Sequence, residues 1–242
     1  MKKLGIVFIL MGLLQACASN RLKNENALSQ VKKVAVIGFK AQLPAASSIG
    51  LLNGGLSGMK GGQMTAMTSP STDLMLSNFV RILEKRQNWQ VLNIKTMKEA
   101  AAYREAYKKT MEGWQNKAVP MGEQGLQQYV VTEIMDTDSA RILGPEGREK
   151  LMKELKVDAI VNLNIYSWLE GMSVMGIGQK KPQSRVFIEA YSRGTEERIW
   201  GEQIDGEKSD ESVGMTGMFD EQKMAALALK SAESAYNKIG NN

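Results

Sequence analysis

Residues 151–166 read LMKELKVDAIVNLNIY, and this stretch carries the two periodicities that decide the fold. Its first half has apolar residues at helical spacing, at Leu151, Met152 and Leu155. They predict a helix that begins near Pro145 and buries one face. Residues 157–166 form a strand-like run in which apolar and polar residues alternate from 161 to 166, which predicts a strand with one apolar and one polar face. A helix followed at once by such a strand is typical of α/β domains.

The rest of the chain continues the alternation of strands and helices. Further strands are expected at 31–39, 89–94, 129–134, 186–191 and 198–204, the last two forming a hairpin turned at 193–195. Further helices are expected after Pro70, over 97–115, and after a capping Asp220 with Gly240 at the C′ position. The final helix has a stripe of small residues that would let it lie close to a sheet. These elements predict one α/β domain over 31–242, with a mixed β-sheet covered by helices.

The first residues have the layout of an export signal. Lys2 and Lys3 precede an uncharged apolar run that ends at Leu14. This run is shorter than the ~20 residues that a membrane-spanning helix needs. It leads into Leu14-Gln15-Ala16-Cys17, which resembles the lipobox of bacterial lipoproteins, an aliphatic residue and a small residue before the cysteine. The alternative is an ordinary secretory signal followed by an unrelated cysteine.

The lipobox interpretation makes residues 1–16 a signal peptide and Cys17 the lipidation site, with Leu14 and Ala16 as the positions that the signal peptidase recognises. Two or more acyl chains hold a protein stably on a membrane, whereas one chain does not. Because Ala18 follows Cys17 rather than an aspartate, the resemblance favours the outer membrane. Residues 17–30 are mostly polar and are expected to form a short flexible tether.

Three stretches resemble the envelope lipoproteins that share the fold of the Tol translocation protein's amino-terminal domain and of the curli secretion channel subunit (CsgG-like). VKKVAVIGF (31–39) is similar to the family's opening strand, LMKELKVDAIVNLNIY (151–166) to its helix and strand, and VFIEAYSRGTEERIW (186–200) to its hairpin. The resemblance implies a periplasm-facing, non-catalytic part of an envelope assembly, often a homo-oligomer. The glycine-rich segments 45–70 and 171–182 lack the alternation of a membrane barrel strand, which favours an accessory or scaffold role over a pore.

The composition argues against several chemistries. The chain has no histidine, which removes the commonest general base and the usual nitrogen ligands of zinc. After removal of Lys2 and Lys3, 29 basic and 26 acidic residues remain, interspersed along the chain, so nucleic acid is not an expected partner. The carboxylates outside the expected helices are interpreted as solvated loop charges rather than catalytic or calcium-binding groups: Asp136, Asp138, Glu202, Asp205, Glu207, Asp210 and Glu211. We therefore expect no enzyme activity, no catalytic residue, no metal site and no cofactor other than the lipid on Cys17.

Methionine is the unusual residue of this sequence. Three pairs recur outside the predicted elements, Met64 with Met67, Met172 with Met175, and Met215 with Met218. Methionine suits adaptable contact surfaces, and this interpretation favours protein partners in the envelope. The alternative is a soft-metal site, because thioethers are ligands for Cu(I). The aromatic residues Tyr103, Tyr107 and Trp114, which share one side of a predicted helix, are interpreted as core.

Overall fold

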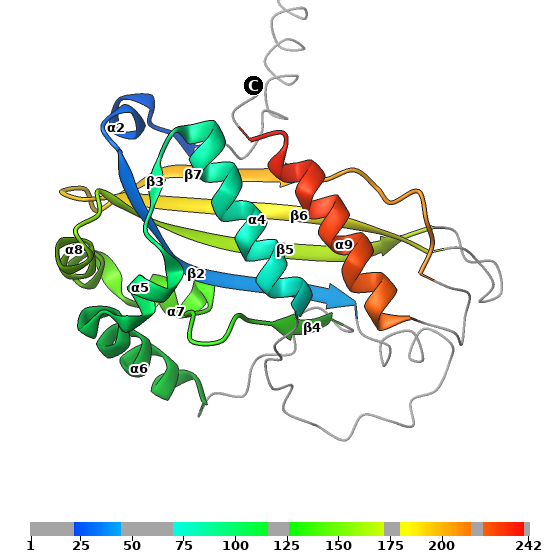
Figure 1. Ribbon diagram of the computed structural model, residues 1–242, viewed down its shortest axis with the longest axis horizontal. Helices are drawn as coiled ribbons and strands as arrows, with labels where there is room; N and C mark the ends of the chain where they lie inside the picture. The colour runs from blue at the N-terminus through cyan, green and yellow to red at the C-terminus, as the bar shows by residue number, and fades with distance from the viewer. Residues whose placement is uncertain (1–21, 45–69, 116–125, 172–179, 214–219, 240–242) are drawn as a thin grey trace, which may run out of the picture.

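The stretch that alternates in sequence forms the central strand of a mixed sheet in the computed structural model, which describes residues 22–44, 70–115, 126–171, 180–213 and 220–239 (Figure 1). The strands in this part of the chain are β1 (Leu22–Lys23), β2 (Lys33–Pro44), β3 (Gln90–Val91), β4 (Leu126–Tyr129), β5 (Ala159–Glu170), β6 (Lys181–Ser192) and β7 (Arg198–Asp205). Their order in the sheet is β1-β7-β6-β5-β2-β3, and β4 pairs with β2. Strand β2 is parallel to β3 and β5, whereas the other pairs are antiparallel.

The helices in the described residues are α2 (Glu25–Ser29), α4 (Pro70–Gln87), α5 (Ile94–Glu99), α6 (Ala101–Gln115), α7 (Thr137–Ile142), α8 (Gly144–Leu155) and α9 (Glu221–Tyr236). Helices α4 and α9 lie side by side across one face of the sheet (Figure 1). They are joined by a ring contact of 5.5 Å between Phe79 and Tyr236, and the Tyr236 hydroxyl donates to the Met75 carbonyl at 3.3 Å. The predicted α/β class and the mixed, helix-covered sheet are confirmed.

Small residues bring α9 close to the sheet, as the sequence predicts. Ala228, Ala232 and Ala235 are fully buried. Two buried serines extend the contact, because the Ser184 hydroxyl on β6 donates to the Ala228 carbonyl at 2.9 Å and the Ser184 amide donates to the Ser231 hydroxyl at 2.9 Å. Where the backbones of β6 and α9 lie this close together, the two serines provide hydrogen-bond partners for backbone groups that water would otherwise have to satisfy.

On the other face of the sheet, α7 packs against β2 and β5. Gly38 on β2 lies beside Asn162 on β5, and a Cβ at Gly38 would be 2.6 Å from the Asn162 amide oxygen and 3.0 Å from the Ala140 Cβ of α7. Glycine is therefore required for this close approach. A β-bulge at Ile37 precedes it, and the Ile37 carbonyl accepts a hydrogen bond from the Tyr103 hydroxyl of α6 at 2.9 Å. Tyr103 is a core residue, as predicted.

The structured domain begins earlier than the sequence indicates. Residues 22–29, assigned above to the flexible tether, contain β1, which pairs with β7, and helix α2. Leu28 is buried, and the Asn24 side chain caps α2 by accepting from the Ala27 amide at 3.1 Å. The tether prediction is therefore wrong for residues 22–30, because isolated Leu22 and Leu28 have partners that lie far away in sequence.

Two predicted elements are shorter or divided. The strand expected over 89–94 is limited to Gln90 and Val91, because Asn93 caps α5 and its side chain accepts from the Lys95 amide at 2.9 Å. The helix expected over 97–115 is divided into α5 and α6 at Ala100, whose backbone is extended. The strand expected at 129–134 lies at 126–129, and α7 was not predicted. Segment 45–69, most of 171–182, and Gly240 lie outside the described residues.

Candidate functional site

The predicted lipidation and signal-peptidase residues Leu14, Ala16 and Cys17 lie outside the described residues, and so do all six methionines of the three pairs. The methionines whose burial is described are core residues: Met75, Met97, Met135, Met152 and Met224. Each of them is 1% exposed or less, so they fill gaps in the interior rather than forming a contact surface.

Two of the predicted solvated carboxylates are buried. Asp136 is 0% exposed and its carboxylate accepts from the Asp138 amide at 2.8 Å, at the start of α7. Glu202 is 7% exposed and accepts from the indole nitrogen of Trp200 at 2.9 Å. The solvated interpretation is wrong for these two residues, because each is held by a hydrogen bond inside the fold. The remaining five carboxylates are exposed or ion-paired. Among the described residues, no three His, Cys, Asp or Glu side chains come together in a group that could hold a metal ion.

The open face of the sheet is the first candidate surface. Along β6 the burial alternates without exception, so that one row of side chains is buried under α9 and the other is half-buried. Helix α9 packs on the buried row of β6. On the half-buried row, Arg141 of α7 contacts Glu189 and Arg148 of α8 lies over the Tyr191 ring. The rest of this row, from residue 181 to 187, and its neighbours on β5 have no helix packed on them among the described residues, and we call this part the uncovered surface.

Aromatic and arginine side chains occupy this surface. The rings of Tyr166 and Trp168 on β5 are 6.0 Å apart, and the Arg185 guanidinium of β6 lies 5.3 Å from the centre of the Trp168 ring. Phe187 follows Arg185 on the same side of β6 and is half-buried. We refer to these four residues as the open-face cluster. Tryptophan, tyrosine and arginine are the residues that contribute most to protein–protein binding energy.

The arginine of this cluster is held in place by β7. The Arg185 guanidinium donates to both carboxylate oxygens of Asp205, at 2.5 and 2.9 Å. This hydrogen bond lowers the pKa of Asp205 below its usual value and raises that of Arg185. The two-point contact fixes the guanidinium plane, so the cluster is preorganised and little side-chain entropy remains to be lost on binding.

Farther along the same face, charges are paired across strands. Glu189 on β6 accepts from Arg141 of α7 at 3.0 Å through each carboxylate oxygen and from Arg198 of β7 at 2.9 Å. The hydrogen bond with Glu189 is the main reason that the pKa of Arg141 is raised. These pairs fix α7 on the sheet at the border of the uncovered surface.

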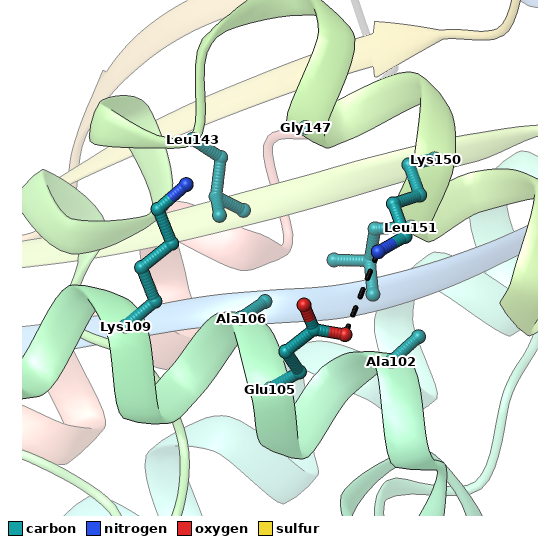
Figure 2. Close-up of a pocket in the computed structure, with 8 residues that line it drawn as sticks. All are labelled: Ala102, Glu105, Ala106, Lys109, Leu143, Gly147, Lys150 and Leu151. Atoms are coloured by element: carbon teal, nitrogen blue, oxygen red, sulfur yellow. Dashed lines mark hydrogen bonds and ion pairs between the residues drawn. The ribbon is translucent and has the colours of Figure 1, made fainter.

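A groove between α6 and α8 is the second candidate surface (Figure 2). It has a cavity of about 90 Å³ and is lined by Ala102, Glu105, Ala106, Lys109, Leu143, Gly147, Lys150 and Leu151. Its floor is apolar, and its charged residues lie at the rim, where Glu105 and Lys150 form an ion pair of 3.5 Å. Cavities of about 150 Å³ with apolar walls accept a benzene molecule, so this groove has room for one aliphatic side chain.

Part of the open-face cluster could be predicted from the sequence, whereas the groove could not. The alternation in 161–166 predicted a polar row on β5 that includes Tyr166, and Trp168 continues it at the period of a strand. The cross-strand partners Arg185 and Asp205 depend on strand register, and the groove depends on the packing of two helices far apart in sequence. No local pattern in the sequence contains that information.

Comparisons with known proteins give only distant likenesses. No family model and no curated protein matches the chain. Among solved structures, it is similar to lipoprotein GNA1162 of Neisseria meningitidis, with 12% identity and a TM-score of 0.39 over 87% of this chain and 99% of that one. It is also similar to a PelC dodecamer of Paraburkholderia phytofirmans, with 9% identity and a TM-score of 0.31 over 85% of this chain and 89% of that one. A third similar structure is the hypothetical protein CT253 of Chlamydia trachomatis, with 9% identity and a TM-score of 0.36 over 85% of this chain and 98% of that one. None of these comparisons assigns the chain to the CsgG-like family. No helix in the described residues is both long and apolar enough to cross a membrane.

Proposed function

We propose that this chain is a lipid-anchored envelope protein, held at the outer membrane through Cys17 and facing the periplasm, that acts as a non-catalytic scaffold or assembly component by contacting other envelope proteins. The observation that carries the proposal is the uncovered sheet face with its half-buried open-face cluster. The lipobox at Leu14 to Cys17 supports the location, and the absence of histidine from the sequence supports a binding role rather than an acid–base one.

The chemistry of the open-face cluster fits a protein partner. Trp168 and Arg185 offer a large apolar area and directed hydrogen-bond donors on a rigid strand pair. The bonds to Asp205 neutralise the guanidinium, so the surface does not select for a highly charged ligand. A surface of this kind suits a partner with a flat apolar patch and a few polar groups at its border.

The location is tested by the covalent state of Cys17. Intact-mass analysis of the purified native chain is expected to show acyl chains on a product that starts at Cys17. The Cys17→Ser variant is expected to lose them and to leave the membrane fraction. A native product with an unmodified thiol, or one that starts elsewhere, would overturn the anchor.

The contact role is tested by photo-crosslinking in intact cells. A photoreactive residue at Gln183, on the open face beside Trp168, is expected to give an adduct of one defined mass. The same residue at Asp73, which is exposed on α4 on the opposite side of the sheet, is the control. The Gln183 adduct must disappear when Trp168 is changed to alanine; an adduct that persists, or no adduct in either position, would contradict the proposal.

Copper binding is the second candidate, and the observation that favours it is the spacing of the three methionine pairs in the sequence. An anaerobic Cu(I) titration of the full chain distinguishes the two functions. We expect no stoichiometric uptake. Tight uptake that is lost when the six methionines are changed to leucine would favour the metal site.

A further inference from the structure

An exposed apolar residue directly precedes one of the residues that line the groove between α6 and α8. Ile142 is 65% exposed, which is more than any other large apolar side chain in the described part of the chain. It is followed by Leu143, whose side chain lines the groove (Figure 2). An exposed apolar side chain is thus adjacent in the chain to a cavity of the size of one aliphatic side chain.

The rim of the groove carries an acidic and a basic residue of opposite charge on the same helix, Glu105 and Lys109. Glu105 and Lys109 are four residues apart on α6, so they lie on the same side of the helix. Lys109 makes no ion pair with any residue that the structure describes, and Glu105 is 71% exposed in its long contact with Lys150. An exposed pair of this kind contributes little to stability, so Glu105 can change partners at low cost.

We propose that this groove is a contact between two copies of the chain related by a two-fold axis. In such an interface the same surface of both copies is in contact. Each contact between two different residues therefore occurs twice, once in each direction. Two α6 helices that cross in opposite directions place Glu105 of each copy opposite Lys109 of the other. Each Ile142 then has the apolar groove of the second copy within its reach.

The size of the surface indicates a weak and reversible dimer. Helix α6 has 15 residues and is therefore roughly 22 Å long. A contact made mainly by one helix of this length is smaller than the ~800 Å² per partner of stable complexes. On a membrane the two copies would be confined to a layer, and the higher effective concentration favours such a contact. The dimer does not depend on the open-face cluster, so either surface can fail its test without the other.

The test is a charge exchange measured by sedimentation velocity of the full chain in detergent, from about 10 µM to about 1 mM. The wild type is expected to show concentration-dependent dimers. Lys109→Glu and Glu105→Lys each place two like-charged pairs across the axis and are expected to weaken association at least about tenfold. The double variant restores opposite charges and is expected to return association to within about threefold of the wild type.

Matched controls separate this contact from a general effect of charge or apolarity. Arg104→Glu makes the same change of charge on α6 but about 100° around the helix from Glu105, away from Lys109, and is expected to leave the dimer intact. Ile142→Ser is expected to weaken the dimer, whereas Leu74→Ser, at a 48% exposed leucine on α4, is not. Trp168→Ala, which tests the proposed function, is also expected to leave it unchanged. A chain that remains monomeric at every concentration, or a double variant no better than the single ones, would overturn the proposal.

Discussion

Asp158 and Lys33 are joined by two hydrogen bonds, and both involve the backbone of Lys33. The Lys33 amide donates to the Asp158 carboxylate at 2.8 Å, and the Asp158 amide donates to the Lys33 carbonyl at 2.8 Å. The same carboxylate oxygen accepts from the Lys32 amide at 3.0 Å, and the Asp158 carbonyl accepts from the amide of Arg193. One aspartate thus joins the start of β2, the start of β5 and the turn between β6 and β7.

Replacement of Asp158 should therefore destabilise the whole domain. Asp158→Ala leaves two backbone amides without their acceptor, and we expect the free energy of unfolding to fall by about 2 kcal/mol. Asp158→Asn keeps one acceptor oxygen and should cost less. Urea unfolding followed by circular dichroism measures both. If alanine and asparagine cost the same and both less than about 0.5 kcal/mol, the carboxylate does not hold these strands together.

Two glycines near the ends of β7 should respond very differently to alanine. A Cβ at Gly206 would lie 2.0 Å from the Ser231 carbonyl oxygen of α9, which is backbone and cannot move without displacing the helix. Gly206→Ala should therefore cost about 3 kcal/mol or more. At Gly194 the φ angle is +75° and nothing lies within 4 Å of a Cβ, so Gly194→Ala should cost only about 1 kcal/mol. Thermal unfolding of the two variants measures the difference, and equal losses would contradict the close packing of α9.

The bounds of a strand could be predicted from the sequence where its buried residues are apolar. They could not be predicted where polar residues are buried beside each other. β6 was predicted from 186 to 191 but begins at Lys181, because buried Ser184 occupies an inward position. Its hydroxyl donates to the Ala228 carbonyl and lies 2.7 Å from the Ser167 hydroxyl on β5, so both serines have hydrogen-bond partners within the core. A sequence shows the serines but not their pairing. The same limit applies to the open-face cluster, whose Arg185 and Asp205 meet only because the register of the hairpin places them side by side.

The ion pair of Arg185 and Asp205 should make a small, pH-dependent contribution to stability. The hydrogen bond from Arg185 lowers the pKa of Asp205. The stabilisation is therefore fully present above the unfolded-state pKa and is lost as the pH falls through the lower folded-state pKa. Asp205 is 46% exposed, so solvent limits the contribution to less than about 1 kcal/mol.

The comparison variant for this effect is Asp205→Asn. Its deficit in unfolding free energy relative to the wild type should be present at pH 7 and disappear in strong acid. Glu84→Gln, at an exposed position of α4, should show no such deficit at pH 7. A deficit of Asp205→Asn that stays constant down to pH 2 would mean that packing rather than charge is responsible.

The buried amide of Asn162 has no hydrogen-bond partner among the described residues, at either its nitrogen or its oxygen. The side chain is 2% exposed and lies against Gly38, where the sheet meets α7. A buried amide without a partner costs about 1–3 kcal/mol, so Asn162→Val, which suits a strand, should raise the free energy of unfolding by about 1 kcal/mol. Asn162→Asp should lower it, because it places a charge in the same site. Urea unfolding of both variants is the measurement. If valine destabilises the protein by as much as aspartate does, the amide holds a bound water or another group, and its hydrogen bonds contribute to the stability of the sheet.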